Sequence, residues 1–306
     1  MVSEKTEKVS LKTIWEFHGA LCLFGIIGCV IRQGLIDLTG FEYGGVLWAN
    51  IAGCFLMGMH IHFFPAKMHA LIGSGACGAI TSLSAMMMVL FELSTSRTEA
   101  WNNGGYGIMV FLAYLIIEFG CSFSALRCGQ HFGLAIKKWG LDIIDEHWIY
   151  TAMPIVSLLG WISALVCAIV IESGRNWTLV LVFAPFGAEA RFLTSRWNQT
   201  TAKYGTLSAN LIGTTICAIL TLLTNPRFHR TKLQLTVISA LISGFCGNYT
   251  TISSFVNEMN GYPVKRGYAY FLITMVPATI ITFLILGPYK WIHDAPYVDI
   301  NHLHPS

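Results

Sequence analysis

The sequence predicts an all-α integral membrane protein in which a single helix joins two inverted repeats of four helices. Three observations carry this prediction. Of the 306 residues 54% are hydrophobic and only 11% are charged, and the mean hydropathy is +0.60, whereas charged residues make up about a quarter of a soluble domain. The apolar residues gather in nine stretches, and the first four stretches share motifs with the last four.

The nine stretches are each expected to form a membrane-spanning helix. Such a helix needs roughly 20 largely apolar residues, and charged residues or clusters of glycine and asparagine bound each stretch. Spans are therefore predicted at residues 14–36, 44–63, 70–92, 106–127, 151–172, 177–194, 205–223, 233–257 and 267–290.

The longest polar interruption separates the fourth span from the fifth and is expected to be an interfacial linker. The predicted organisation is an N-terminal tail (1–13), a first repeat (14–127), the linker (128–150), a single span (151–172), a second repeat (173–290) and a C-terminal tail (291–306).

Matched motifs show the internal repeat. The first spans of the two repeats contain GIIGCVIRQGL and APFGAEARFLT, the second spans GGVLWANIAG and YGTLSANLIG, and the third spans GSGACGAITSLSAMM and LISGFCGNYTTISSF. These motifs pair Gly28 with Gly187, Arg32 with Arg191, Asn50 with Asn210, Gly53 with Gly213, Gly75 with Gly244, Gly78 with Gly247, Thr81 with Thr250 and Ser84 with Ser253.

The single middle span shares none of these motifs, and its presence sets the orientation of the repeats. Four spans return the chain to its starting side, so one additional span makes the second repeat enter the membrane from the opposite side. Basic residues are more frequent in the loops on the side of the N terminus. The positive-inside rule therefore predicts a cytoplasmic N terminus and an extracellular C terminus. No removable signal peptide is expected at the polar N terminus.

The third spans are expected to be broken in the middle. Each carries glycines and consecutive threonine or serine residues inside an apolar stretch. Backbone groups freed by a break in the membrane need a partner or form a site, and inverted repeats place their sites at such breaks. Carbonyl oxygens from both copies could surround one small hard cation there.

Several function classes are disfavoured. The net charge of +3 is small and scattered, so no nucleic-acid partner is expected. The nine cysteines lie mostly in apolar stretches without a CxxC motif, as buried hydrophobic residues do. No phosphate-binding loop and no catalytic constellation occurs within the spans, so an enzyme is not expected. Asn176-Trp177-Thr178 is a glycosylation sequon on the predicted outer side.

The combined motifs resemble the fluoride channel family, specifically the eukaryotic exporters in which two repeats are fused around a linker helix. The resemblance covers residues 19 to 290. It implies a fluoride-selective channel that passively expels cytoplasmic fluoride across the plasma membrane. It also implies a single chain that acts as a pseudo-dimer in the lipid bilayer.

The same resemblance implies which residues line a narrow polar track in each repeat. Asparagine amides and hydroxyl groups would donate hydrogens to a partly dehydrated fluoride ion. The implied residues of the second repeat are Thr206, Asn210, Thr251, Ser253, Phe255, Tyr270 and Thr274, and those of the first repeat are Asn50, Ser82, Ser84, Tyr114 and Glu118.

Two further sets of residues follow from the resemblance. The backbone carbonyls of Gly78, Thr81, Gly247 and Thr250 would hold a structural sodium ion. Arg32 and Arg191, near the ends of their spans, would form a positive vestibule, with snorkelling to lipid headgroups as the alternative.

The two tracks are not expected to be equivalent. Family members carry two phenylalanines per repeat, but the four positions here are Leu83, Met86, Ile252 and Phe255. An ionised Glu118 would also repel fluoride. A single conducting track is therefore expected around Thr206, Asn210, Phe255, Tyr270 and Thr274. The family draws each track from both repeats, so the assignment of individual hydroxyl groups stays open.

The main alternative is a proton-coupled exporter of small solutes built from tandem four-span units. Such a carrier would have membrane carboxylates at matched positions of both halves. Glu118 aligns with Thr274, however, and Glu189 aligns with Val30. The lack of a matched pair favours the channel.

Overall fold

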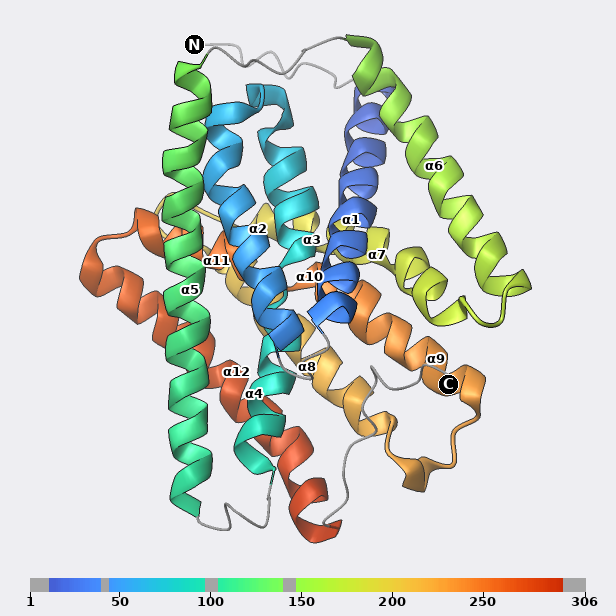
Figure 1. The fold of residues 1–306 in the computed structure, drawn as a ribbon, viewed down its shortest axis with the longest axis vertical. Helices are drawn as coiled ribbons and strands as arrows, with labels where there is room; N and C mark the ends of the chain where they lie inside the picture. Colours follow the sequence, from blue (N-terminus) through green and yellow to red (C-terminus); the bar gives the residue numbers. More distant parts are fainter. Residues whose placement is uncertain (1–10, 40–43, 97–103, 140–146, 294–306) are drawn as a thin grey trace, which may run out of the picture.

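The computed structural model describes residues 11–39, 44–96, 104–139 and 147–293. In this part of the chain the structure is helical apart from short connections and an isolated bridge between Asn198 and Lys203. Figure 1 shows a bundle with α5 on one side and α6 on the other. The helices are α1 (Leu11–Thr39), α2 (Gly44–Phe63), α4 (Leu83–Thr95), α5 (Gly104–Lys138), α6 (His147–Val170), α7 (Arg175–Ser195), α8 (Tyr204–Leu223), α9 (Lys232–Ala240), α11 (Ser253–Gly261) and α12 (Val264–His293), with the shorter η1 (Ala66–Met68), η2 (Leu71–Cys77), α3 (Gly78–Ile80), η3 (Pro226–Phe228), η4 (Leu241–Cys246) and α10 (Gly247–Tyr249).

Eight helical segments of the described residues are long and apolar enough to cross a membrane. They correspond to eight of the nine expected spans. The remaining expected span, 177–194, is the helix α7 of 21 residues. Its sequence includes Pro185, Glu189 and Arg191 and is less apolar than the other eight.

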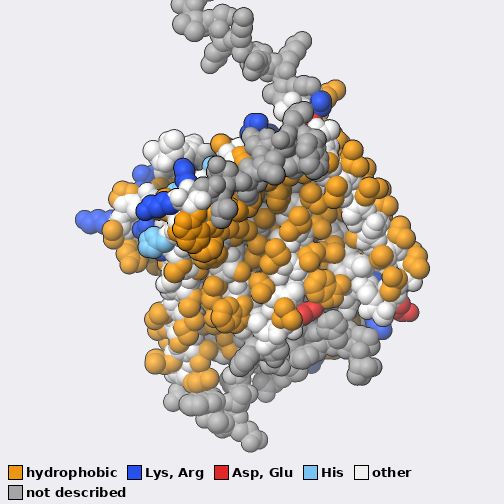
Figure 2. Space-filling model, turned by 45° about the horizontal axis from the view of Figure 1, so that its top comes forward, with side chains coloured by type: hydrophobic (Ala, Val, Ile, Leu, Met, Phe, Trp, Pro, Cys, Tyr) orange, Lys and Arg blue, Asp and Glu red, His pale blue; other side chains and the backbone are white. Residues whose placement is uncertain are grey.

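The outer surface of the bundle is apolar. Figure 2 shows hydrophobic side chains over most of the visible face. Large aliphatic residues are exposed on several helices, including Ile116 at 72%, Ile169 at 69% and Leu284 at 69%. A continuous apolar surface of this kind is suited to lipid contact and would be unstable in water. The protein is therefore a multi-pass membrane protein.

Helix α5 is longer than the sequence predicted, because it continues to Lys138 through residues expected in the linker. Two glycines in this extension, Gly129 and Gly133, let its backbone approach α2 closely. A Cβ atom on Gly129 would collide with the Phe55 carbonyl oxygen, and one on Gly58 of α2 would collide with the Leu126 carbonyl oxygen. Such small residues four apart favour close helix packing in membranes. Residues 147–150 of the predicted linker belong to α6, and residues 140–146, with parts of both predicted tails, lie outside the described residues.

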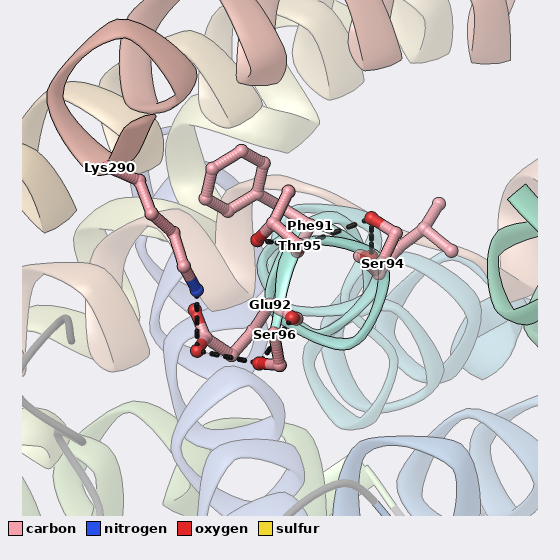
Figure 3. Close-up of polar contacts among 7 residues, drawn as sticks. Phe91, Glu92, Ser94, Thr95, Ser96 and Lys290 are labelled. Atoms are coloured by element: carbon pink, nitrogen blue, oxygen red, sulfur yellow. Dashed lines mark hydrogen bonds and ion pairs between the residues drawn. The ribbon is translucent and has the colours of Figure 1, made fainter. Parts of the chain in front are cut away.

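The second halves of the third spans pack across the two repeats. Helix α4 of the first repeat packs against α8 of the second, and α11 of the second packs against α2 of the first. One ion pair closes the end of this arrangement, where the Lys290 ammonium group of α12 lies 2.8 Å from the Glu92 carboxylate of α4 (Figure 3). Ser96 also donates a hydrogen bond to that carboxylate, at 3.1 Å.

Candidate functional site

Both third spans are interrupted at the positions that the sequence predicted. In the first repeat the chain is helical through η2 and α3, becomes extended at Thr81 and Ser82, and resumes as α4. In the second repeat η4 and α10 precede an extended Thr250, and α11 begins at Ser253. The segments before both breaks are π-helical, a form that is frequent at functional sites. Thr81 and Thr250 are completely buried, so both breaks lie inside the bundle.

The hydroxyl groups of two threonines cross between the repeats and cap the opposite half-helix. Thr81 Oγ1 accepts the Ser253 N–H at 3.1 Å, and Thr250 Oγ1 accepts the Ser84 N–H at 3.1 Å. Each threonine also donates to the carbonyl four residues earlier in its own repeat. The matched threonines thus form equivalent hydrogen bonds, one from the first repeat to the second and one from the second repeat to the first. This equivalence is what a two-fold relation between the repeats produces.

Asn50 and Asn210 close the broken ends in the same way. Asn50 Oδ1 accepts the Ser82 N–H at 2.9 Å, and Asn210 Oδ1 accepts the Thr251 N–H at 2.8 Å. Both asparagines are completely buried. Their amide nitrogens differ, because that of Asn210 donates to the Thr251 carbonyl at 3.1 Å and that of Asn50 donates to the Glu118 carboxyl at 2.5 Å.

The predicted residues of the second repeat gather around a glutamate. The Glu258 carboxyl accepts from the Thr206 hydroxyl at 2.7 Å and from the Tyr270 hydroxyl at 2.8 Å. The Phe255 ring lies edge-on to Tyr270, with centroids 5.1 Å apart, and is fully buried. Asn210 lies one turn from Thr206 on α8. A polar line therefore runs from Asn210 to Glu258, with an aromatic edge beside it.

Among the described residues the Thr274 hydroxyl group forms no hydrogen bond with another side chain of this line. It follows Tyr270 by one turn on α12 and is completely buried. Its hydroxyl group donates to the Tyr270 carbonyl oxygen at 2.9 Å. The hydroxyl is thus folded back on its own helix.

The corresponding positions of the first repeat have two apolar residues in place of polar ones and one additional carboxyl group. Val46 and Val89 replace Thr206 and Glu258, and Glu118 replaces Thr274. Tyr114 and Ser122 on α5 are also buried.

The structure places both arginines in the interior of the bundle, and their vestibule role stays a prediction. Arg32 is 2% exposed and Arg191 is 3% exposed. Arg32 donates to the carbonyls of Ala79 in its own repeat and Ser243 in the other, and Arg191 donates to those of Asn248 and Ser74. Both guanidinium groups thus link the repeats through carbonyl oxygens. The reason is that a buried guanidinium group needs acceptors, and the broken helices provide them.

The carbonyl oxygens near the breaks are of the type that sodium prefers. In an unbroken helix the carbonyls of Gly78 and Gly247 would accept from the amides of residues 82 and 251, but those amides bond to Asn50 and Asn210. Hard oxygen donors left without their helical partner fit an alkali cation. The Arg191 guanidinium also donates to the Thr250 carbonyl at 3.4 Å, so a cation here would share this acceptor with a positive side chain.

Several residues of the site were absent from the expected set. Glu258 follows the second-repeat motif LISGFCGNYTTISSF by three residues, and this position could have indicated it. Asn198 lies in a loop, yet its side chain accepts the Thr206 N–H at 3.1 Å and donates to the Glu258 carboxyl at 3.4 Å. Asn248 donates to the Gly25 and Ala184 carbonyls of both first spans, at 3.1 and 2.9 Å. Sequence spacing gives no indication of these long-range contacts.

A comparison with protein-family models identifies the family. The model described as "CrcB-like protein, Camphor Resistance (CrcB)" matches residues 19–130 and again residues 178–287. The chain belongs to the CrcB-like family. The two matched segments of this CrcB-like protein coincide with its two repeats, which confirms the predicted duplication and the family resemblance.

Several proteins that are similar to this CrcB-like chain have names that refer to fluoride. Fluoride export protein 1 of Candida albicans is 31% identical over 94% of this chain and 82% of its own length. Fluoride export protein 1 of Saccharomyces cerevisiae is 26% identical over 88% of this chain and 91% of its own length. Fluoride-specific ion channel FluC 1 of Streptococcus pneumoniae is 31% identical over 32% of this chain and 86% of its own length. No solved structure gives a significant match.

Proposed function

We propose that this CrcB-like protein is a fluoride-selective channel that exports cytoplasmic fluoride across the plasma membrane. The observation that carries the proposal is the buried polar line in which Thr206 and Tyr270 donate to Glu258, Asn210 lies one turn from Thr206, and the Phe255 ring packs against Tyr270. The names of the similar fungal and bacterial proteins support fluoride as the ion. They describe transport proteins and give no support to the proton-coupled carrier.

Selectivity for fluoride follows from protein donors that replace the water molecules around the ion. Fluoride is small and strongly hydrated, so a dry apolar passage would exclude it. Oriented amide and hydroxyl donors can replace its water without trapping it as a buried fixed cation would. The positive edge of an aromatic ring adds a weak attraction for an anion. A membrane potential that is negative inside drives export by about 2.3 kcal/mol per 100 mV, so conduction needs no nucleotide.

The proposed arrangement in the membrane has nine spans, with α7 as the sixth, and inverted repeats. The single helix α6 between two four-helix sets supports the inversion, as do the matched reciprocal bonds of Thr81 and Thr250. The proposed topology has the N terminus in the cytoplasm and the C terminus outside, from the distribution of basic residues.

A structural sodium ion is the proposed cofactor. The carbonyls of Gly78, Thr81, Gly247 and Thr250 would hold it, and the ion would join the repeats by a fixed positive charge. We expect purification in an organic cation instead of sodium to lower the melting temperature. An unchanged melting temperature across sodium concentrations would contradict this assignment.

The proposed single conducting track uses the second repeat, and matched substitutions test it. Asn210→Asp and Asn50→Asp each keep the oxygen that accepts a backbone N–H and remove the amide donor. With the protein in liposomes and a fluoride-selective electrode outside, we expect Asn210→Asp to lower efflux at least about tenfold, the effect of losing about 1.4 kcal/mol. Asn50→Asp should leave efflux within about twofold of the unsubstituted protein. Equal losses in both variants would contradict a single track.

A further inference from the structure

Glu118 makes one contact that has no counterpart in the other repeat. Its Oε1 accepts the Asn50 amide hydrogen at 2.5 Å, and the carboxyl group is completely buried between α5 and α2. At the matched position the Thr274 hydroxyl bonds to its own helix. The Asn50 amide therefore already has an acceptor from a side chain, whereas no side chain crosses to Asn210 in the described residues.

The surroundings of Glu118 hold it in this place. Among the described residues no basic side chain forms an ion pair with it. The Asn50 amide is the partner that compensates part of the cost of burying the carboxyl group. Releasing that amide to a passing anion would take this donor from the buried carboxyl group and place that group beside a negative ion.

We infer that Glu118 closes the polar line of the first repeat by occupying the amide of Asn50, the donor that an anion would need. This inference rests on the proposed fluoride channel. Glu258 accepts from two hydroxyl groups of the second line, but the Asn210 amide donates to a backbone carbonyl and not to a carboxyl group, so the two lines differ at the asparagine. The closure of the first line is thus assigned to the Glu118 side chain and its hydrogen bond with Asn50. The apolar replacements Val46 and Val89 make the closed line less polar but do not bond to the Asn50 amide, whose hydrogen goes to Glu118.

The test exchanges the two matched side chains. Thr274→Glu places a carboxyl in the second line, and we expect it to lower fluoride efflux from liposomes at least a hundredfold. Adding Glu118→Thr to Thr274→Glu should raise efflux at least tenfold above Thr274→Glu alone. The recovery should stay below full activity, because Val46 offers no hydroxyl group. Glu118→Gln in the same background keeps an oxygen that accepts from Asn50, so it should give no gain.

Each outcome bears on the inference. It is overturned if Glu118→Thr gives no gain over a folded Thr274→Glu protein, or if Glu118→Gln gains as much as Glu118→Thr. Gel filtration and melting temperature identify variants that fail to fold, and Glu118→Ser in the Thr274→Glu background then replaces Glu118→Thr with the same expected gain. Failure of the proposed channel is distinguishable, since the unsubstituted protein would then pass no fluoride above protein-free liposomes.

Discussion

At the scale of single residues, the interior is organised by polar side chains that bond to broken backbone. Asn50, Asn210, Thr81 and Thr250 are each completely buried and each accept an amide hydrogen at a break. An unpaired amide in hydrocarbon costs several kcal/mol. These side chains therefore stabilise the broken backbone in addition to any contact they make with an anion. A substitution tests the anion contact alone only if it keeps the oxygen that accepts the backbone amide hydrogen.

Thr206 offers a test of the hydroxyl line that spares those acceptors. Its hydroxyl donates to Glu258 at 2.7 Å, and the first repeat has Val46 at this position. We expect Thr206→Val to lower fluoride efflux about tenfold, because loss of a hydrogen bond to a charged or acidic group removes about 1.5–3 kcal/mol. Efflux from liposomes measures this. Val46→Thr is the matched control in the first repeat and should not change efflux. Full efflux by the Thr206→Val protein would show that the Thr206 hydroxyl group takes no part in fluoride passage.

At the scale of helices, close packing of α5 against α2 fixes the wall of the first repeat. Glycines on both helices bring backbone atoms into contact. The same packing places Glu118 opposite Asn50, so the register of these two helices determines the contact that closes the first line. A helix that moved by one turn would separate the two side chains.

The packing predicts a difference between two glycines of the same helix. Gly129→Ala should lower the free energy of unfolding by about 1–3 kcal/mol through overpacking, because the added methyl group meets the Phe55 carbonyl. Gly120 has no atom within 4 Å of an added Cβ, so Gly120→Ala should be neutral or slightly stabilising. Thermal unfolding in detergent compares them. Equal melting temperatures for the two variants would contradict the close approach of α5 and α2.

At the scale of the whole molecule, the two repeats depend on each other. Threonines and arginines of each repeat bond to the other, and Phe255 of α11 lies between Phe119 of α5 and Tyr270 of α12, with ring centroids 5.9 and 5.1 Å away. Aromatic groups from both repeats therefore meet beside the polar line of the second repeat. One repeat alone would leave these buried acceptors and donors unpaired.

A passive channel also predicts how the whole molecule responds to driving forces. A potassium gradient and an ionophore fix the membrane potential of the liposomes. Fluoride efflux should increase as the interior becomes more negative, because the driving free energy is the ion's charge times the potential. A proton gradient of either direction should leave efflux unchanged at a fixed potential. Efflux that requires a proton gradient would instead indicate the carrier.

The sequence by itself determined the membrane class, the duplication and the positions of the broken spans. Hydropathy depends on composition along the chain, and a repeat is visible wherever matched residues recur at matched spacing, as with Asn50 and Asn210. The sequence also indicated the inequality of the two lines, through Glu118 and the single phenylalanine of the four aromatic positions. These features are local and need no knowledge of packing.

Only the tertiary structure decided which distant groups meet. The burial of Arg32 and Arg191, the contact of Asn198 with Thr206 and Glu258, and the length of α5 all depend on helix packing. Sequence position put the arginines near span ends, but the bundle brings the carbonyls of both repeats to them. A charge in an apolar interior is stable only where acceptors converge, and that convergence is set by three-dimensional contact between segments far apart in the chain.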